Sequence, residues 1–77
     1  MGWDTINDKH NMKFNRHFVS CDDPSEMLYI KECIKVEFPI LSEDTINNAI
    51  LSCCASILAP RLRSAVISCL KKKLGGS

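Results

Sequence analysis

The sequence lacks a long apolar run and the usual marks of export. No stretch of this 77-residue chain approaches the ~20 consecutive apolar residues that a membrane-spanning helix needs, so we expect no membrane partner. The polar start, MGWDTINDKH, has neither the basic nor the apolar region of a secretory signal, and no Asn-x-Ser/Thr glycosylation site occurs. These absences predict a cytoplasmic protein.

The cysteine spacing typical of a zinc site is also missing. Structural zinc sites present Cys-x2–4-Cys pairs, whereas the closest pair here, Cys53 and Cys54, is adjacent and would point about 100° apart on a helix. We therefore expect no metal and no cofactor. An odd number of cysteines without a secretory signal predicts free thiols in a reducing compartment. Cys33, Cys53 and Cys69 fall on predicted apolar faces and should be small buried side chains.

Residues that could act as catalysts are few. Cys21 lies four residues from His17, but Asp22 and Asp23 would raise the pKa of its thiol and weaken it as a nucleophile. The two histidines, His10 and His17, are expected at the surface. A chain of 8.7 kDa has little room for a preorganised catalytic site. We predict no catalytic residue, no enzymatic activity and no small-molecule substrate.

Three helices are indicated after residue 21. The first covers 24–37, with Asp23 as N-cap, Pro24 at its first position and Pro39 just beyond its end. The second covers 42–58, capped by Ser42. The third covers 60–73 and starts with Pro60, although one helix over 42–73 that bends at this proline is an alternative.

Residues 1–20 show no helical periodicity. An imperfect alternation over 12–20 suggests a short strand, so this part is predicted to be a flexible or extended arm. The predicted fold class is all-α: a small three-helix bundle over 21–74, preceded by an extended or partly disordered N-terminal arm. Residues 75–77 are expected to be a disordered tail or a cloning scar. The predicted core is Ile30, Ile34, Phe38, Leu41, Ile46, Ile50, Cys53, Ile57, Leu62, Val66 and Leu70.

Charge is unevenly distributed along the chain. Residues 21–44 carry a net −5 and residues 45–77 a net +5, in a chain whose total is +1. Together with the small size, this asymmetry predicts a protein-interaction module that binds another protein or a second copy of itself. The candidate contact residues are aromatic: Phe14, Phe18, Tyr29 and Phe38.

The alternative function is nucleic-acid binding. The second and third helices would form a helix-turn-helix-like pair whose basic residues grip phosphate or base edges. The candidate residues for this contact are Arg61, Arg63, Ser64, Lys71, Lys72 and Lys73. The salt dependence of binding distinguishes the two functions, because nucleic-acid binding releases counterions and its affinity falls steeply as the salt concentration rises.

Overall fold

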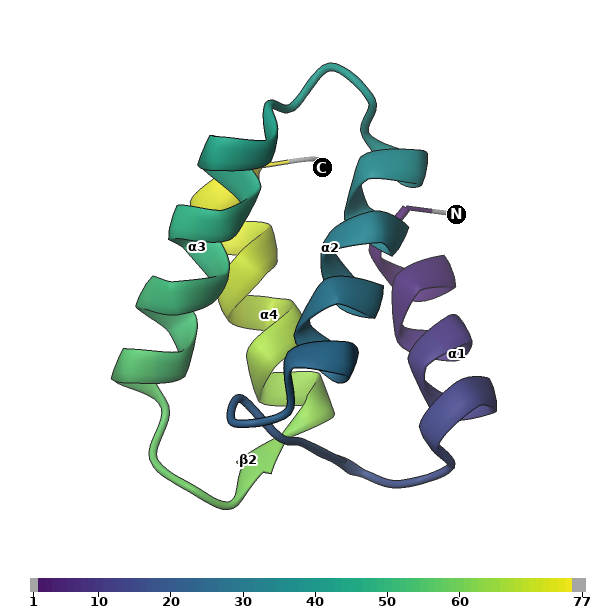
Figure 1. Cartoon of the computed structure of the whole chain (residues 1–77), viewed down its shortest axis with the longest axis vertical. Helices are drawn as coiled ribbons and strands as arrows, with labels where there is room; N and C mark the ends of the chain where they lie inside the picture. The colour runs from purple at the N-terminus through teal and green to yellow at the C-terminus, as the bar shows by residue number, and fades with distance from the viewer. Residues whose placement is uncertain (1, 76–77) are drawn as a thin grey trace.

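The computed structural model describes residues 2–75, which form four helices and one short strand pair (Figure 1). The helices are α1 (Trp3–Phe14), α2 (Pro24–Glu37), α3 (Glu43–Ser56) and α4 (Arg63–Leu74), and the strands are β1 (Phe18–Val19) and β2 (Arg61–Leu62). Successive helices run in opposite directions. Both α1 and α3 pack against α2 and α4, so the four helices surround one core. The molecule is therefore mostly helical with a small antiparallel sheet.

The predicted N-terminal arm is not confirmed, because residues 3–14 form α1. Trp3, Ile6 and His10 are spaced at three and four residues and are all buried on one side of this helix. His10 occupies a position that an apolar residue usually fills, so the apolar residues of this segment alone do not show the spacing of a helix. The expectation of a surface His10 was wrong, since its side chain is 1% exposed.

The predicted boundaries of the first expected helix, now α2, are confirmed. The Asp23 side chain accepts hydrogen bonds from the backbone N–H groups of Ser25 and Glu26, and Pro24 opens the helix. At the other end, the Phe38 N–H donates to the Ile34 carbonyl, just before Pro39. Local capping chemistry therefore sets both ends of α2.

The segment between α3 and α4 differs from the prediction. The α3 helix begins after Ser42, whose hydroxyl accepts from the Thr45 N–H as expected, and it ends at Ser56. The α4 helix begins at Arg63 rather than at Pro60, so the single bent helix over 42–73 is wrong. The Arg63 N–H donates to the His17 carbonyl at 2.7 Å, which ties the start of α4 to the segment before α2.

The intervening residues form β2, which pairs with β1 in antiparallel register. Phe18 lies opposite Leu62, and Val19 lies opposite Arg61. Val19 points into the core at 3% exposure, whereas Phe18 and Leu62 point outward at 44% and 48%. Leu62 was expected in the core, and that prediction was wrong because the strand pairing directs its side chain toward solvent.

The core draws apolar side chains from all four helices and from β1. Most of the expected core is confirmed as buried, while Phe38, Leu41 and Ile57 are partly buried around it. None of the four described helices is both long and apolar enough to cross a membrane. The buried hydrophobic residues are Trp3, Ile6, Val19, Ile30, Cys33, Ile34, Ile46, Ala49, Ile50, Cys53, Val66 and Leu70.

Two disulfides hold α3 to the rest of the chain. Cys54 is bonded to Cys21, and its neighbour Cys53 is bonded to Cys69 in α4. Adjacent side chains on a helix point about 100° apart, which lets α3 be linked to two different segments. The prediction of free thiols is wrong for these four cysteines, and Cys33 alone is unpaired.

Candidate interaction surfaces

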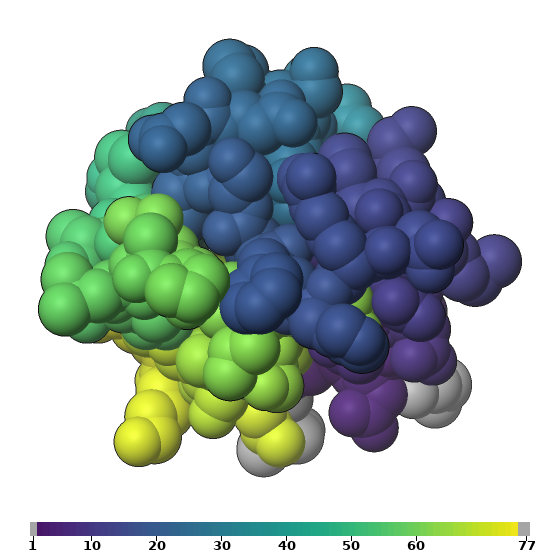
Figure 2. Space-filling model, turned by 90° about the horizontal axis from the view of Figure 1, so that it is seen from below, coloured from purple at the N-terminus to yellow at the C-terminus, as the bar shows by residue number. Residues whose placement is uncertain are grey.

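The end of the molecule that carries the two strands exposes several apolar residues. We name the four larger ones the β-end cap: Phe18, Leu58, Pro60 and Leu62. Leu58 is 83% exposed and follows α3, while Phe18 and Leu62 face each other across the strand pair. Figure 2 views this end and shows the dark blue segment before α2 beside the green segment before α4. Pairing thus gathers residues about 40 positions apart in the sequence.

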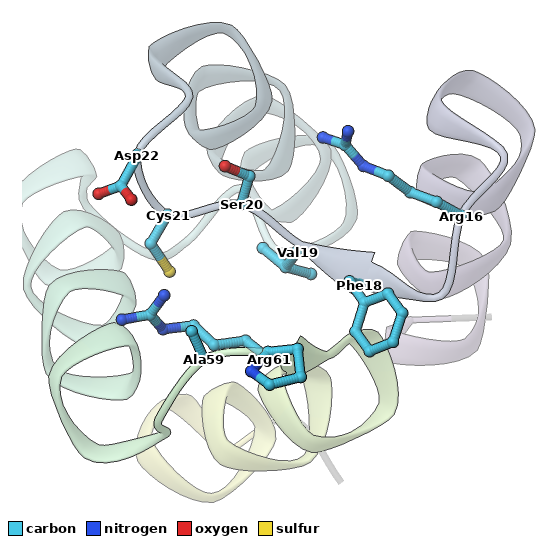
Figure 3. A pocket seen from close by; sticks show the side chains of 9 residues that line it. Arg16, Phe18, Val19, Ser20, Cys21, Asp22, Ala59 and Arg61 are labelled. Carbon is cyan, nitrogen blue, oxygen red and sulfur yellow. The ribbon is translucent and has the colours of Figure 1, made fainter.

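A cleft of about 250 Å³ opens between the segment before α2 and the segment before α4 (Figure 3). Residues 18–22 line one side and residues 59–61 line the other, with Arg16 at the edge. Val19 contributes a buried apolar side chain, and the Arg61 side chain extends toward Cys21 and Asp22. The cleft therefore has a mixed lining of apolar side chains, two arginines and the acidic Asp22.

The two arginines beside the cleft are held in place. The Arg61 Nε donates to the Cys54 carbonyl at 3.1 Å, and Arg16 donates from Nη2 to Glu26 Oε1. The Cys21–Cys54 disulfide joins the loop of Arg16 to the helix that anchors Arg61. A guanidinium that is already oriented loses less conformational entropy when a partner binds.

An acid–base cluster, formed by the buried residues His10 and Glu26 and the exposed Arg16, links α1 and α2. Glu26 is fully buried, and its Oε2 lies 2.5 Å from His10 Nε2. Arg16 supplies the second contact, so the carboxylate is paired on both oxygens. Within the described residues His10 Nδ1 has no hydrogen-bond partner. His10 and Glu26 are sealed from solvent, and the cluster therefore acts as a polar link between two helices.

The four aromatic candidates for protein contact are not brought together. Phe14 is half-buried and packs against His10 and Tyr29, with ring centroids 4.9 and 5.7 Å away. Phe38 packs against Trp3 at 5.0 Å. Phe18 is the most exposed of the four and belongs to the β-end cap.

The candidate nucleic-acid residues fall into two groups, one in β2 and the start of α4 and the other near the end of α4. Arg63 donates to Asn7 Oδ1 at 2.8 Å, to Asn11 Oδ1 at 3.4 Å and to the Arg16 carbonyl. Arg61 is similarly engaged with the Cys54 carbonyl, and Ser64 is exposed nearby. The exposed residues Lys71–Lys73 lie about 15 Å further along the helix.

The remaining thiol, Cys33, is buried in α2. Burial raises the pKa of this thiol, which keeps it protonated and weakly nucleophilic. Desolvation also raises the pKa of Tyr29, and the neighbouring Cys33 adds to that effect. Among residues 2–75 no group of three or more histidine, cysteine or acidic side chains is placed to hold a metal ion.

The outward side of α3, which we name the α3 face, carries no charge after its first turn. It consists of the exposed residues Asn47, Asn48, Leu51, Ala55 and Ser56. Sixteen consecutive residues, 45–60, contain no aspartate, glutamate, lysine, arginine or histidine, whereas no other such run exceeds seven. The length of this uncharged run is visible in the sequence alone and marks the α3 face before the fold is known.

Comparison of the chain with protein-family models, with curated proteins and with solved structures gives no match in any of the three searches.

Proposed function

We propose that this domain is a non-enzymatic protein-interaction module and that the β-end cap is its contact surface. The observation that carries the proposal is the exposure, by 44–83%, of Phe18, Leu58 and Leu62 at one end of the molecule, where Phe18 also lines a cleft. Isolated exposed hydrophobic residues are normal, but a group of them around a hollow is typical of a binding site. Aromatic and arginine side chains, both present here, are enriched at protein interfaces.

The chemistry of the cleft supports a particular kind of partner. Val19 and Pro60 in its lining suit one apolar side chain, and the two arginines, against the single acidic residue Asp22, favour a carboxylate beside it. We therefore propose a partner segment in which an apolar residue is flanked by aspartate or glutamate. The apolar contact would supply most of the affinity, and the charges would guide encounter and orientation.

The disulfides change the proposed compartment. Such bonds form and persist in oxidising surroundings and are rare in the cytosol. With four of five cysteines paired, we propose that the module works in an oxidising compartment, in place of the cytoplasm that the sequence suggested.

Selection of peptides from a random library on the immobilised oxidised domain tests the proposal. Enriched peptides should bind the wild-type domain and lose at least about tenfold in affinity for Leu58→Lys, which places a charge in the apolar contact. The matched control is Ile40→Lys, because Ile40 is 93% exposed and lies in the α2–α3 turn at the opposite end. Equal binding to both variants, or no enrichment, would refute the cap as the contact surface.

Nucleic-acid binding stays the second candidate, because Lys71–Lys73 form an exposed basic group. It has less support, since the Arg63 guanidinium already bonds to Asn7 Oδ1, Asn11 Oδ1 and the Arg16 carbonyl. A residue-resolved NMR titration with a short mixed-sequence duplex tests it. Shifts at the lysines that fade between ~50 and ~200 mM salt would support this function, and an unchanged spectrum would remove it.

A further inference from the structure

The α3 face differs from an ordinary solvated helix surface. Helices exposed to water usually carry lysine and glutamate on their outer side, and one quarter of this chain is charged. The exposed side of α3 instead presents Asn47, Asn48, Leu51 and Ala55. Charged residues are depleted in the buried centre of protein interfaces, which is the composition found here.

The same side of the molecule carries both a projection and a hollow. Leu51 is 60% exposed and stands one helical turn beyond Asn47. Asn47 and Ile50 line a groove of about 280 Å³ between α3 and α2, whose opposite wall includes Met27 and Leu28. A surface with an apolar projection next to an apolar groove can fit a second copy of itself, because each copy offers what the other needs.

Charges at the two ends of α3 indicate how two copies would be oriented. Glu43 and Asp44 are exposed at the N-terminal end of the helix, and Arg61 follows its C-terminal end. In an antiparallel pair, the acidic end of each helix lies near the basic end of the other. A parallel pair would instead place like charges and like helix-dipole ends together.

We propose that the α3 face binds a second copy of this chain, forming a twofold dimer in which the α3 helices are antiparallel. Leu51 of each copy occupies the α2–α3 groove of the other. The molecule measures 30 × 25 × 22 Å, so one side offers no more than the ~800 Å² per partner of a standard interface. No covalent bond joins the two copies in this arrangement, so the proposed dimer is reversible and forms as concentration rises. It shares Arg61 with the cleft but uses none of the four residues of the β-end cap, so variants of Leu51 and of Leu58 test the two proposals separately.

Sedimentation velocity of the oxidised chain, from ~5 to ~500 µM, tests this dimer. The wild-type mass should rise from the monomer value of 8.7 kDa toward twice that value. Leu51→Lys should raise the dissociation constant at least about tenfold, because the groove would have to bury an ammonium group beside Lys31. Since Leu51 is exposed, this variant should keep the wild-type melting temperature.

The matched control is Met12→Lys, which makes the same kind of change on α1. Met12 is 83% exposed, and α1 lies on the side of the molecule away from α3. The dissociation constant of the Met12→Lys dimer should equal that of the wild-type dimer. A wild-type chain that stays at 8.7 kDa throughout, or two variants that weaken association equally, would overturn the proposal.

A mixed sample of isotope-labelled and unlabelled chains locates the interface directly. Intermolecular NOEs should connect the Leu51 methyl groups of one copy with the side chains of Met27 and Leu28 in the other. NOEs between residues of the β-end cap would instead show association through that surface and would overturn the α3 interface. Selected peptides that still bind the cap in that case would leave the proposed function intact.

Discussion

The α1–α2 side and the α3–α4 side of this bundle are held together by different chemistry. Between α1 and α2, a sealed carboxylate at Glu26 is paired with His10 and with Arg16. Between α3 and α4, the Cys53–Cys69 disulfide makes the link. A chain of this size has a thin core, and it gains rigidity from charge pairing on one side and from covalent bonds on the other.

The α1–α2 side and the α3–α4 side depend on different solution conditions. A buried ion pair is secure only while every partner is present, because a single uncompensated charge in the interior is costly. A disulfide is independent of charge but depends on an oxidising environment. The two sides should therefore fail under different treatments, and each can be broken separately.

The largest effect is expected for Glu26→Ala. This change leaves His10, which is 1% exposed, without its carboxylate, and removing one partner of a buried pair costs about 3–5 kcal/mol. Urea unfolding should show that loss, and amide exchange should accelerate first in α1. Glu32→Ala on the exposed side of α2 is the control and should stay within about 0.5 kcal/mol of wild type. Equal stability of the two variants would show that the cluster does not hold α1.

A somewhat smaller effect is expected when the α3–α4 link is removed by the double change Cys53→Ala and Cys69→Ala. The disulfide closes a loop of 16 residues, for which the chain-entropy model gives about 3 kcal/mol. Cys33→Ala removes a buried thiol without breaking a crosslink and serves as the packing control. Guanidinium unfolding of the oxidised variants measures how much more stability the double variant loses than Cys33→Ala. An equal loss in both would show that the Cys53–Cys69 bond does not stabilise the α3–α4 side.

The smallest loss of stability is expected at alkaline pH, and it comes from Cys33 in α2. Because burial raises the pKa of Cys33, the folded chain holds this proton more tightly than the unfolded chain does. Its stabilising contribution is thus complete below the unfolded pKa and is lost as pH rises through the folded pKa. Urea midpoints between about pH 7 and 10 should fall more steeply for wild type than for Cys33→Ala. Parallel curves would exclude the thiol as the cause.

The sequence predicts those helices whose ends are set locally. Asp23 with Pro24, and Ser42, act within a few residues of their own positions, so α2 and the start of α3 follow from the sequence. The α1 helix could not be found in this way, because a buried histidine takes an apolar position. Its burial depends on Glu26, which lies 16 residues away.

The strand pair and the disulfides are long-range features that local patterns do not contain. The alternation over 12–20 predicts a strand that overlaps β1, but no local pattern predicts β2 or the pairing between the two strands. The cysteine pairings likewise follow from the folded arrangement, since spacing alone does not determine connectivity. The β-end cap and its cleft could not be predicted for the same reason. The α3 face could have been found, because an uncharged run is a local property of the sequence.

The hydrogen bond from Trp3 Nε1 to the Gly75 carbonyl, at 3.1 Å, brings the two ends of the described chain together (Figure 1). The order of the helices along the chain could therefore be changed without moving the helices in space. A circular permutant that joins these ends through a short glycine-rich linker, and opens the exposed turn at Pro39–Ile40, would retain every helix, both strands and both crosslinks. The α1–α2 and α3–α4 pairs would then exchange places along the polypeptide while keeping their positions in space.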